Sequence, residues 1–491
     1  MQNDFKIKDW ILNWDNFRKI YLFLCLIYFM PSSFDIEQYP LWICFFWGSL
    51  IIAVDFFTKR EMFKSKYWYI LILMSLVYLL STVVNYEHQL IRGAYNWVYL
   101  VTTFFVIYPI NSKQSNEDVK KNMTQFNNIL IYTVFVAGLI SVLMFIFNIG
   151  FIIPSGATTA RQGFVASRLF GIYTSPNIGA IFGFLSIVLS MLNNLIKRGV
   201  WYKFTKLYIA NIIIQVLFFI LASSRGTELT IMVFSLLSIV FIVIPYFIQT
   251  YKSKTKVIFR TILVFLAFFA VSLGFTGILK EGLSYVPGLV QQGFDKAGVN
   301  EPQISDDEKP SKKEPIDRVT IQHSPDDAEV SSGRFTIWTA ALNVVKQFPV
   351  LGATDPYFYR NDIEHNTQID ESKLSTLDKN ELKRAHGNMH NVYIQTLIMS
   401  GILGFVVIAV FIILHLRDNI THLLKYKKVT VDYQIVAIMI FLIVALFAED
   451  LVESHIIFKV KDVVAIVFWY YLGLLQHFRK EKMFTDGVIE K

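Results

Sequence analysis

Four arginines of this chain have side chains that could bind phosphate. Arg161, Arg168, Arg225 and Arg334 all lie next to long apolar stretches. A guanidinium does not deprotonate and presents a planar fork of N–H donors, so several of them in one cavity would bind a diphosphate. For any one arginine alone, contact with a lipid phosphate or a backbone carbonyl is the simpler explanation.

Two histidines, His386 and His390, lie one helical turn apart in the segment HGNMHN. They could ligate a metal, but no third histidine or carboxylate stands at ligand spacing. A neutral histidine beside arginines could instead accept a proton as a general base. The acidic turn of Glu449, Asp450 and Glu453 is either simply solvated or orients His390. The sequence thus predicts no metal site and no cofactor, and it leaves the choice between the two histidines open.

The elements that must position these residues are apolar helices. Of the 491 residues, 54% are hydrophobic and only 17% are charged, which is more apolar than a soluble core can bury. The formal charge of +8 does not indicate nucleic-acid binding, because the basic residues stand in short runs between apolar stretches. Cys25 and Cys44 lie within apolar stretches, so no disulfide framework is expected. The fold class predicted is an all-α polytopic membrane protein with about twelve spans.

The predicted spans are apolar runs that are long enough to cross a bilayer. They lie near residues 19–33, 40–57, 67–84, 93–110, 127–150, 176–196, 204–223, 227–249, 258–279, 391–416, 432–448 and 455–477. The first nine spans occupy residues 1–279, and a large loop follows over residues 280–390. Residues 391–491 hold the last three spans and a cytoplasmic tail.

Basic residues gather in every second connection between these runs, which is typical of cytoplasmic loops. Both termini are therefore predicted to be cytoplasmic, and the large loop between the ninth and tenth spans is predicted to be extracytoplasmic. A flexible charged insertion is expected over about residues 301–330. An amphipathic helix is expected to follow over about residues 332–347, behind a serine cap. The four arginines lie on the outward side, against the positive-inside bias.

Several short motifs follow one another on this outward side. They are Arg168 to Gly171 with Pro176-Asn177, Ser224 to Gly226, Ser332-Gly333-Arg334 with Trp338, Pro349 and Gly352, and His390-Asn391 with Tyr393 and Gln395. Their order resembles the O-antigen ligase and Wzy-type polysaccharide polymerase superfamily of lipid-linked oligosaccharide glycosyltransferases. The first four spans match only in being hydrophobic. The charged insertion and the long segment from Tyr357 to Arg384 depart from the family's pattern.

The resemblance implies transfer of a glycan from an undecaprenyl diphosphate carrier to a hydroxyl of an acceptor glycan, at the outer face of the bacterial cytoplasmic membrane. It implies an inverting, metal-independent transfer in which His390 is the base and Arg168, Arg225 and Arg334 hold the diphosphate. The further residues implied in substrate binding are Arg161, Asn391, Tyr393, Glu453 and Trp338. The expected partners are the lipid-linked oligosaccharide, the bilayer, a flippase and chain-length regulator proteins.

A polymerase and a ligase differ in the acceptor only. The abundance of Ile, Lys, Asn and Phe indicates an AT-rich genome, common among single-membrane bacteria without lipid A. This favours a polymerase for capsule, exopolysaccharide or cell-wall polysaccharide over transfer of the O-antigen ligase type. A lipid-linked oligosaccharide flippase or transporter is the rival from another class, but its charges would lie near mid-membrane. A non-catalytic scaffold would leave the outward arginines and His390 unexplained.

Overall fold

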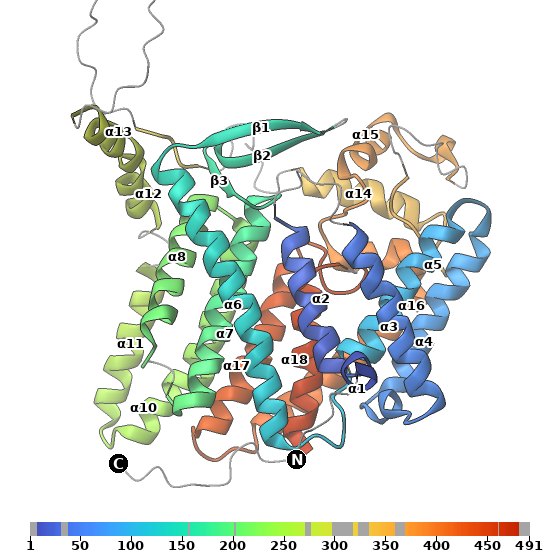
Figure 1. The fold of residues 1–491 in the computed structure, drawn as a ribbon, viewed down its shortest axis with the longest axis horizontal. Coiled ribbons are helices and arrows are strands. Elements are labelled where there is room, and N and C mark those ends of the chain that lie inside the picture. Colours follow the sequence, from blue (N-terminus) through green and yellow to red (C-terminus); the bar gives the residue numbers. More distant parts are fainter. Residues whose placement is uncertain are drawn as a thin grey trace, which may run out of the picture.

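The structure is a computed structural model, and it describes residues 7–30, 38–155, 158–200, 203–270, 276–296, 318–322, 333–358, 369–459 and 461–480. The described chain is mostly helical, and its long helices stand side by side in a bundle (Figure 1). A small sheet and several short helices cover one end of this bundle. Most of the charged insertion predicted over about residues 301–330 lies outside the described residues.

The described helices are α1 (Ile7–Ile11), α2 (Trp14–Tyr28), α3 (Gln38–Phe57), α4 (Trp68–Val84), α5 (Tyr86–Thr102), α6 (Asn116–Ile146), α7 (Pro176–Arg198), α8 (Lys206–Ala222), α9 (Arg225–Ser238), α10 (Ile244–Thr250), α11 (Lys254–Ala270), α12 (Thr276–Ser284), α13 (Val286–Lys296), α14 (Arg334–Val345), α15 (Thr376–Ala385), α16 (Val392–Leu423), α17 (Val431–Glu449) and α18 (Val463–Lys480). Short 3-10 helices cover Glu61–Lys64 and Glu371–Lys373, and π-helical turns cover Thr103–Ile107 and Ile239–Val243. Each of the predicted apolar runs overlaps one or more of these described helices.

Seven helical segments of the described chain are long and apolar enough to cross a membrane. They are Pro40–Phe57, Leu90–Ile107, Asn116–Ile146, Pro176–Arg198, Arg225–Thr250, Val392–Leu423 and Val431–Glu449. Shorter apolar helices cover Trp68–Val84, Lys206–Ala222 and Val463–Arg479. The polytopic helical class is therefore confirmed, and the count of about twelve spans stays a prediction.

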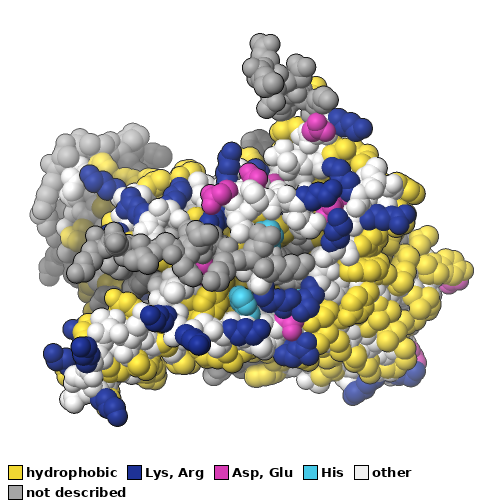
Figure 2. Space-filling view, turned by 90° about the horizontal axis from the view of Figure 1, so that it is seen from below, with side chains coloured by type: hydrophobic (Ala, Val, Ile, Leu, Met, Phe, Trp, Pro, Cys, Tyr) yellow, Lys and Arg dark blue, Asp and Glu magenta, His cyan; other side chains and the backbone are white. Residues whose placement is uncertain are grey.

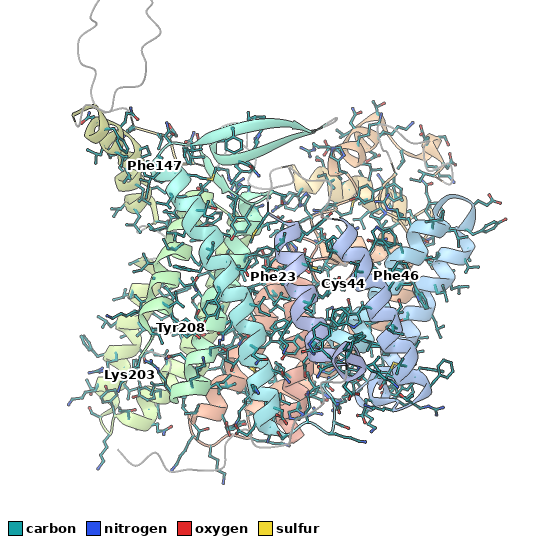
Figure 3. All side chains as sticks on the ribbon, in the orientation of Figure 1. Phe23, Cys44, Phe46, Phe147, Lys203 and Tyr208 are labelled. Carbon is teal, nitrogen blue, oxygen red and sulfur yellow. The ribbon has the colours of Figure 1, made fainter. Side chains whose placement is uncertain are left out.

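The outer surface of the bundle is apolar. Phe23 on α2 and Phe46 on α3 project outward with 43% and 65% of their surfaces exposed, whereas Cys44 is buried inside (Figure 3). In water such a surface would be costly, but in lipid it needs no protein cover. The basic side chains gather at the end of the bundle opposite the sheet (Figure 2). The exposed ones at the helix connections there include Lys59, Arg60, Lys113, Lys121, Lys197, Arg198, Lys252, Lys425 and Lys427.

The last predicted span, over residues 455–477, begins later than expected. The helix α18 begins at Val463, and Asp462 caps it by accepting the Val464 N–H at 2.8 Å. The residues before it form a turn in which Asp450 accepts the N–H groups of His455 and Ile456, each at 3.0 Å. The charges that interrupt the apolar run thus belong to a connection and not to the span.

A three-stranded antiparallel sheet is a feature that the all-α prediction missed. It consists of β1 (Gly150–Ser155), β2 (Thr158–Val165) and β3 (Arg168–Gly171) in the order β1-β2-β3. Ala166 and Ser167 connect β2 to β3 with φ values of 50° and 63°, which makes a two-residue turn of the kind that closes hairpins. This turn usually contains Gly or Asn, so its sequence gave no signal. The hairpin matters because Arg168 is the first residue of β3.

The predicted amphipathic helix exists as α14, which is shorter than the range 332–347. The residue before it is Gly333, with φ 70° and no side-chain cap, so the expected serine cap is wrong. Ile337, Ala340, Ala341 and Val344 form its buried face, which packs among α15 and α16. The remaining surface exposes apolar residues, such as Phe335 at 63%, so the helix is apolar on more than one side.

The helix α16 contains a break that explains the preceding Pro and Gly of the large loop. Gly401, with φ 63° and ψ −171°, interrupts the helical backbone. The N–H groups of Ile402 and Leu403 then bond to the carbonyls of Pro349 and Val350 at 2.8 and 3.2 Å. The large loop is therefore bonded by its backbone into α16 close to the start of that helix, and its carbonyls satisfy two of the N–H groups that the break frees.

Replacing Gly401 by alanine should destabilise the protein strongly. Its backbone conformation is accessible to glycine almost alone, and an added Cβ would lie 2.1 Å from the Val350 carbonyl oxygen. We expect a cost of more than about 3 kcal/mol, seen as a large drop in the melting temperature of the purified protein. Gly277→Ala is the matched control, because no described atom lies within 4 Å of its added Cβ. Equal melting temperatures of the two variants would contradict the account of the break.

Candidate active site

The candidate site lies at the end of the bundle that carries the sheet and α14. Polar caps place two of its residues at helix starts. Ser175 accepts the Asn177 N–H at the start of α7, where Pro176 fixes the first turn. Ser224 caps α9 in the same way and places Arg225 in its first turn. Helix starts direct N–H groups and side chains into one space, which suits the binding of an anion.

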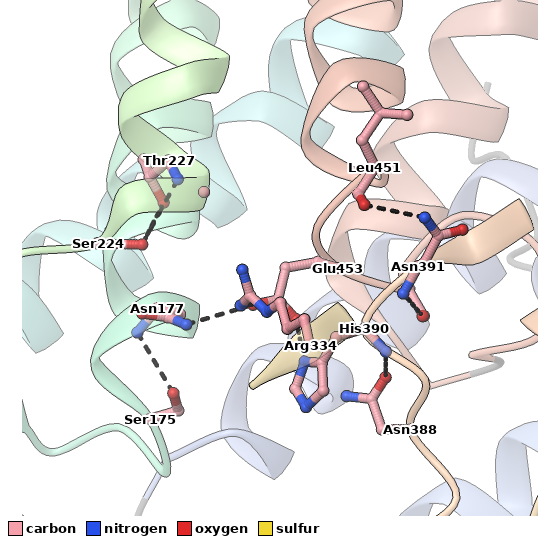
Figure 4. Close-up of polar contacts among 12 residues, drawn as sticks. Ser175, Asn177, Ser224, Thr227, Arg334, Asn388, His390, Asn391, Leu451 and Glu453 are labelled. Atoms are coloured by element: carbon pink, nitrogen blue, oxygen red, sulfur yellow. Dashed lines mark hydrogen bonds and ion pairs between the residues drawn. The ribbon is translucent and has the colours of Figure 1, made fainter. Parts of the chain in front are cut away.

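The carboxylate of Glu453 is the centre of the contacts in this site. Its Oε2 lies 3.0 Å from His390 Nδ1, and its Oε1 accepts a hydrogen bond of 2.9 Å from Arg334 Nη2. The same Oε1 accepts one from Asn177 Nδ2 at 3.2 Å (Figure 4). Only 6% of Glu453 is exposed, so these partners replace water around the charge.

The charge state of Glu453 follows from the same contacts. Burial alone would raise its pKa, but the hydrogen bond from His390 and the positive charges of His455 and Arg334 outweigh burial and lower the pKa below its usual range. Glu453 is therefore ionised at neutral pH. An ionised carboxylate at Nδ1 favours the imidazole tautomer that is protonated there, which leaves Nε2 as the basic nitrogen.

Arg168 joins the same group through Asn177. Its Nη2 donates to Asn177 Oδ1 at 2.8 Å, and its Nε donates to the Ala222 carbonyl at 2.8 Å. These bonds fix the guanidinium between β3, α7 and the end of α8. The structure thus brings together Arg168, Arg334, His390 and Glu453 of the predicted residues.

The backbone around His390 is held in an uncommon conformation. His390 has φ 47°, and its N–H donates to Asn388 Oδ1 at 3.0 Å. Trp338 Nε1 donates to the Met389 carbonyl at 2.9 Å, which ties α14 to the residue before His390. Asn391 caps α16 and also donates to the Leu451 carbonyl at 3.0 Å. Trp338 and Asn391 therefore position His390. Tyr393, in the first turn of α16, donates its hydroxyl hydrogen to the Phe447 carbonyl at 3.3 Å.

Three other predicted residues lie apart from this group. His386 ends α15 with φ 45° and is exposed, so it is His390 that reaches Glu453. Arg161 lies on β2 opposite Ile152 with its side chain exposed. Arg225 lines a cavity of about 140 Å³ between α8, α9 and α12. Its neighbour Gly226 approaches the site, because an added Cβ would lie 3.8 Å from Glu453 Cγ.

Lys280 is a cation of this cavity that the sequence analysis missed. It lines the cavity with Arg225 and Glu228. Burial lowers its pKa, and the nearby charges of Glu228 and Arg168 act on that pKa in opposite directions. The Arg168 charge thus acts on Lys280 across this end of the bundle. Lys280 could have been found from the sequence, because it follows an apolar run on the side predicted to be outward, against the positive-inside bias.

Residues 210–409 match the family described as O-antigen ligase. This match confirms the resemblance to the O-antigen ligase and Wzy-type superfamily. A search of curated proteins found no match. The O-antigen ligase region begins within α8 and ends within α16, so it contains Arg225, Arg334 and His390 but neither Arg168 nor Glu453. The match supports glycosyl transfer of the ligase or polymerase type on lipid-linked oligosaccharides in a membrane.

No group of three or more His, Cys, Asp or Glu side chains that could hold a metal ion occurs in the part of the chain that the structure describes.

A second histidine and acid pair lies beyond the O-antigen ligase region. His455 Nδ1 lies 2.6 Å from Asp462 Oδ2, and both side chains are more than nine-tenths buried. The sequence analysis missed this pair because it counted both residues as part of the last span.

The His455–Asp462 pair should make stability fall with rising pH. Burial lowers the pKa of His455, but the charge and hydrogen bond of Asp462 outweigh burial and raise the pKa to about 9 from 6.5. Protonated His455 thus stabilises the fold fully below about pH 6.5, and this contribution, on the order of 3 kcal/mol, is lost as the pH rises through about 9. Asp462→Asn keeps an oxygen to cap α18 but removes the charge. Melting temperatures between pH 6.5 and 9 should therefore fall more steeply in the natural protein than in Asp462→Asn, and parallel curves would refute this.

Proposed function

We propose that this protein is a polysaccharide polymerase that transfers an undecaprenyl diphosphate-linked glycan to a hydroxyl of a carrier-linked repeat unit. The observation that carries the proposal is the contact of His390 with an ionised Glu453 beside Arg334. A base needs a nitrogen that is free to take a proton, and the carboxylate at Nδ1 leaves Nε2 for that role. The O-antigen ligase match supports the reaction class.

The reaction is a direct displacement with inversion. His390 Nε2 accepts the proton of the acceptor hydroxyl, and that oxygen forms a bond to the anomeric carbon of the donor sugar. The bond between this carbon and the diphosphate oxygen breaks, and the diphosphate leaves on its lipid. Arg168, Arg225 and Arg334 stabilise the charge that develops there. Glu453 is a positioning residue, because it holds His390 and Arg334 and touches no reacting atom.

The membrane orientation belongs to the same proposal. The basic side chains at the far end of the bundle favour a cytoplasmic location for that end, which supports an active site at the outer face of the cytoplasmic membrane (Figure 2). The last residues of α18 also lie at that basic end, where His477 Nε2 contacts Asn116 Oδ1 at the start of α6 at 3.0 Å. This arrangement supports cytoplasmic termini. A flippase and chain-length regulators would act beside the protein.

Transfer of the ligase type to a different acceptor is the second candidate, and the description of the matched family favours it. Purified protein in lipid, with the undecaprenyl diphosphate-linked repeat unit of the same strain, distinguishes the two. A polymerase lengthens this substrate into a ladder on a gel. Intact substrate with no ladder would indicate a ligase that requires another acceptor, or a flippase. A ladder that persists with a chelator would support metal independence.

His390→Ala should reduce the rate of elongation by roughly 10²–10⁴-fold, since it removes the general base. Carrier-lipid binding should stay unchanged, because the arginines remain. His386→Ala is the matched control, for it removes an exposed imidazole four residues away and should retain full activity. Gel ladders over time give the rates. Wild-type elongation by His390→Ala, or equal losses in the two variants, would exclude His390 as the base.

Arg225→Lys should slow elongation on the order of 10²-fold, nearly as much as Arg225→Ala, because an ammonium cannot reproduce the bidentate fork. Arg198→Lys at the exposed end of α7 controls for the substitution itself. Binding of undecaprenyl diphosphate and elongation rate should be measured on the same samples. Full activity of Arg225→Lys would mean that its charge alone suffices and would remove the role of the fork.

A further inference from the structure

A second cavity, of about 190 Å³, lies between α5, the segment after Gly352, the start of α16 and the connection before α18. The polar side chains that line it include Arg92, Asn96, Asp355, Asn388, Ser454 and Lys459. None of the residues that surround the Glu453 carboxylate lines it. The cavity is smaller than the roughly 300–1,000 Å³ of sites that enclose drug-sized ligands, so it has room for about one sugar ring.

The wall of this cavity is also the support of His390. Asn388, which lines the cavity, accepts the His390 N–H at 3.0 Å. Ser454 also lines it, follows Glu453 directly, and accepts the Asn391 N–H through its Oγ at 2.9 Å. A ligand held in the cavity would therefore lie next to the backbone that carries the base.

Arg92 of the cavity and the arginines Arg168 and Arg225 come from opposite parts of the bundle. Arg92 and Asn96 come from α5, whereas Arg168 and Arg225 come from the segments around α7 and α8. In Figure 1, α5 stands at one edge of the bundle and α8 near the opposite edge. Separate acceptor and diphosphate sites suit a direct displacement, because the hydroxyl attacks one face of the anomeric carbon while the diphosphate departs from the opposite face.

Contacts with Asp355 and Tyr357 fix the position of the Arg92 guanidinium at the cavity. Its Nε lies 2.6 Å from Oδ2 of Asp355, whose side chain is fully buried. Its guanidinium carbon lies 3.9 Å from the centre of the Tyr357 ring. Asp355 Oδ1 also accepts the Tyr357 N–H at 3.0 Å, which fixes the aromatic ring relative to the carboxylate. About a third of the Arg92 side chain is exposed, so its remaining N–H donors can reach the cavity.

The backbone on the other side of Tyr357 is adapted to the same ring. Gly387 has φ 75°, and an added Cβ would lie 2.5 Å from a ring carbon of Tyr357. The ring can lie against the backbone only because this residue is glycine. The planar stack that results has a rigid guanidinium at the cavity, and rigid planar donors suit the paired hydroxyls of a sugar.

The charges of the cavity favour a sugar over a second diphosphate. Asp355 neutralises Arg92, which leaves Lys459 as the remaining cation of the lining. The arginines proposed to hold the diphosphate, Arg168, Arg225 and Arg334, would supply the several positive charges that a diphosphate requires. Amide, hydroxyl and guanidinium groups around a small space instead match a ligand that has many hydroxyls and little charge.

We infer that this cavity binds the terminal sugar of the acceptor glycan and holds its hydroxyl towards His390. The inference rests on the proposed function, since it names the second substrate's place in that site. Arg92 and Asp355 then act in acceptor binding, and the acceptor is recognised by its sugar and not by its lipid.

Binding measurements test this separately from transfer. The full chain in lipid nanodiscs is titrated with the strain's repeat unit as a decyl glycoside without diphosphate, and in parallel with undecaprenyl diphosphate. Arg92→Ala should weaken binding of the glycoside at least tenfold and leave binding of undecaprenyl diphosphate unchanged. Arg225→Ala should do the reverse. Arg417→Ala, an exposed arginine at the basic end of the bundle, should change neither.

The double variant R92Q/D355N guards against misfolding, because it removes both charges and leaves no buried carboxylate unpaired. It should weaken glycoside binding like Arg92→Ala while keeping the melting temperature of the natural protein. Unchanged glycoside binding in both variants, or no glycoside binding by the natural protein, would overturn the inference. An elongation rate that Arg92→Ala leaves unchanged would overturn the role of the cavity in acceptor binding, but not the proposed polymerase activity. Arg92-dependent glycoside binding without any transfer would instead count against the polymerase.

Discussion

The buried carboxylate of Glu453 is the interaction on which the site depends. A charge that is 6% exposed must be surrounded by donors, and this chain supplies them from three distant segments, through Asn177, Arg334 and His390. Removing any one partner would leave an incompletely paired charge in a dry environment. The requirement to satisfy Glu453 therefore holds α7, α14 and the start of α16 at fixed positions relative to one another.

The bilayer imposes the other constraint. Apolar helices need no cover on their outer faces, so the buried core is reserved for packing between helices and for the few polar groups that bond across them. Where a spanning helix is irregular, other parts of the protein must then hydrogen-bond its freed backbone N–H and C=O groups. The break at Gly401 shows how, because the segment from Pro349 to Gly352 supplies the missing backbone partners. The large loop is thus joined to a spanning helix at the same end as the site.

Much of this architecture could be predicted from the sequence. Apolar runs located the helices because length and hydrophobicity largely determine them in lipid. The arginines predicted to be outward, with His390, identified most of the residues around Glu453. The sheet could not be predicted from the sequence, because Ala166 and Ser167 form its tight turn and neither residue type is typical of such a turn. Pairings between distant segments, such as Arg92 with Asp355, depend on how helices pack, which no local pattern contains. The pair of His455 and Asp462 was not predicted, because both residues lie in an apolar run that was assigned to a span but begins with a turn.

The order of these groups along the chain has a consequence for biogenesis. Arg168 and Asn177 enter the membrane in the first half of synthesis, whereas Glu453 follows α17, close to the end. Because segments insert from the amino terminus onward, a nascent chain carries Arg168 and Asn177 long before it carries the Glu453 carboxylate to which Asn177 bonds. The centre thus matures in a single late step. Until that step, Asn177, Arg334 and His390 lack the shared acceptor that joins their segments.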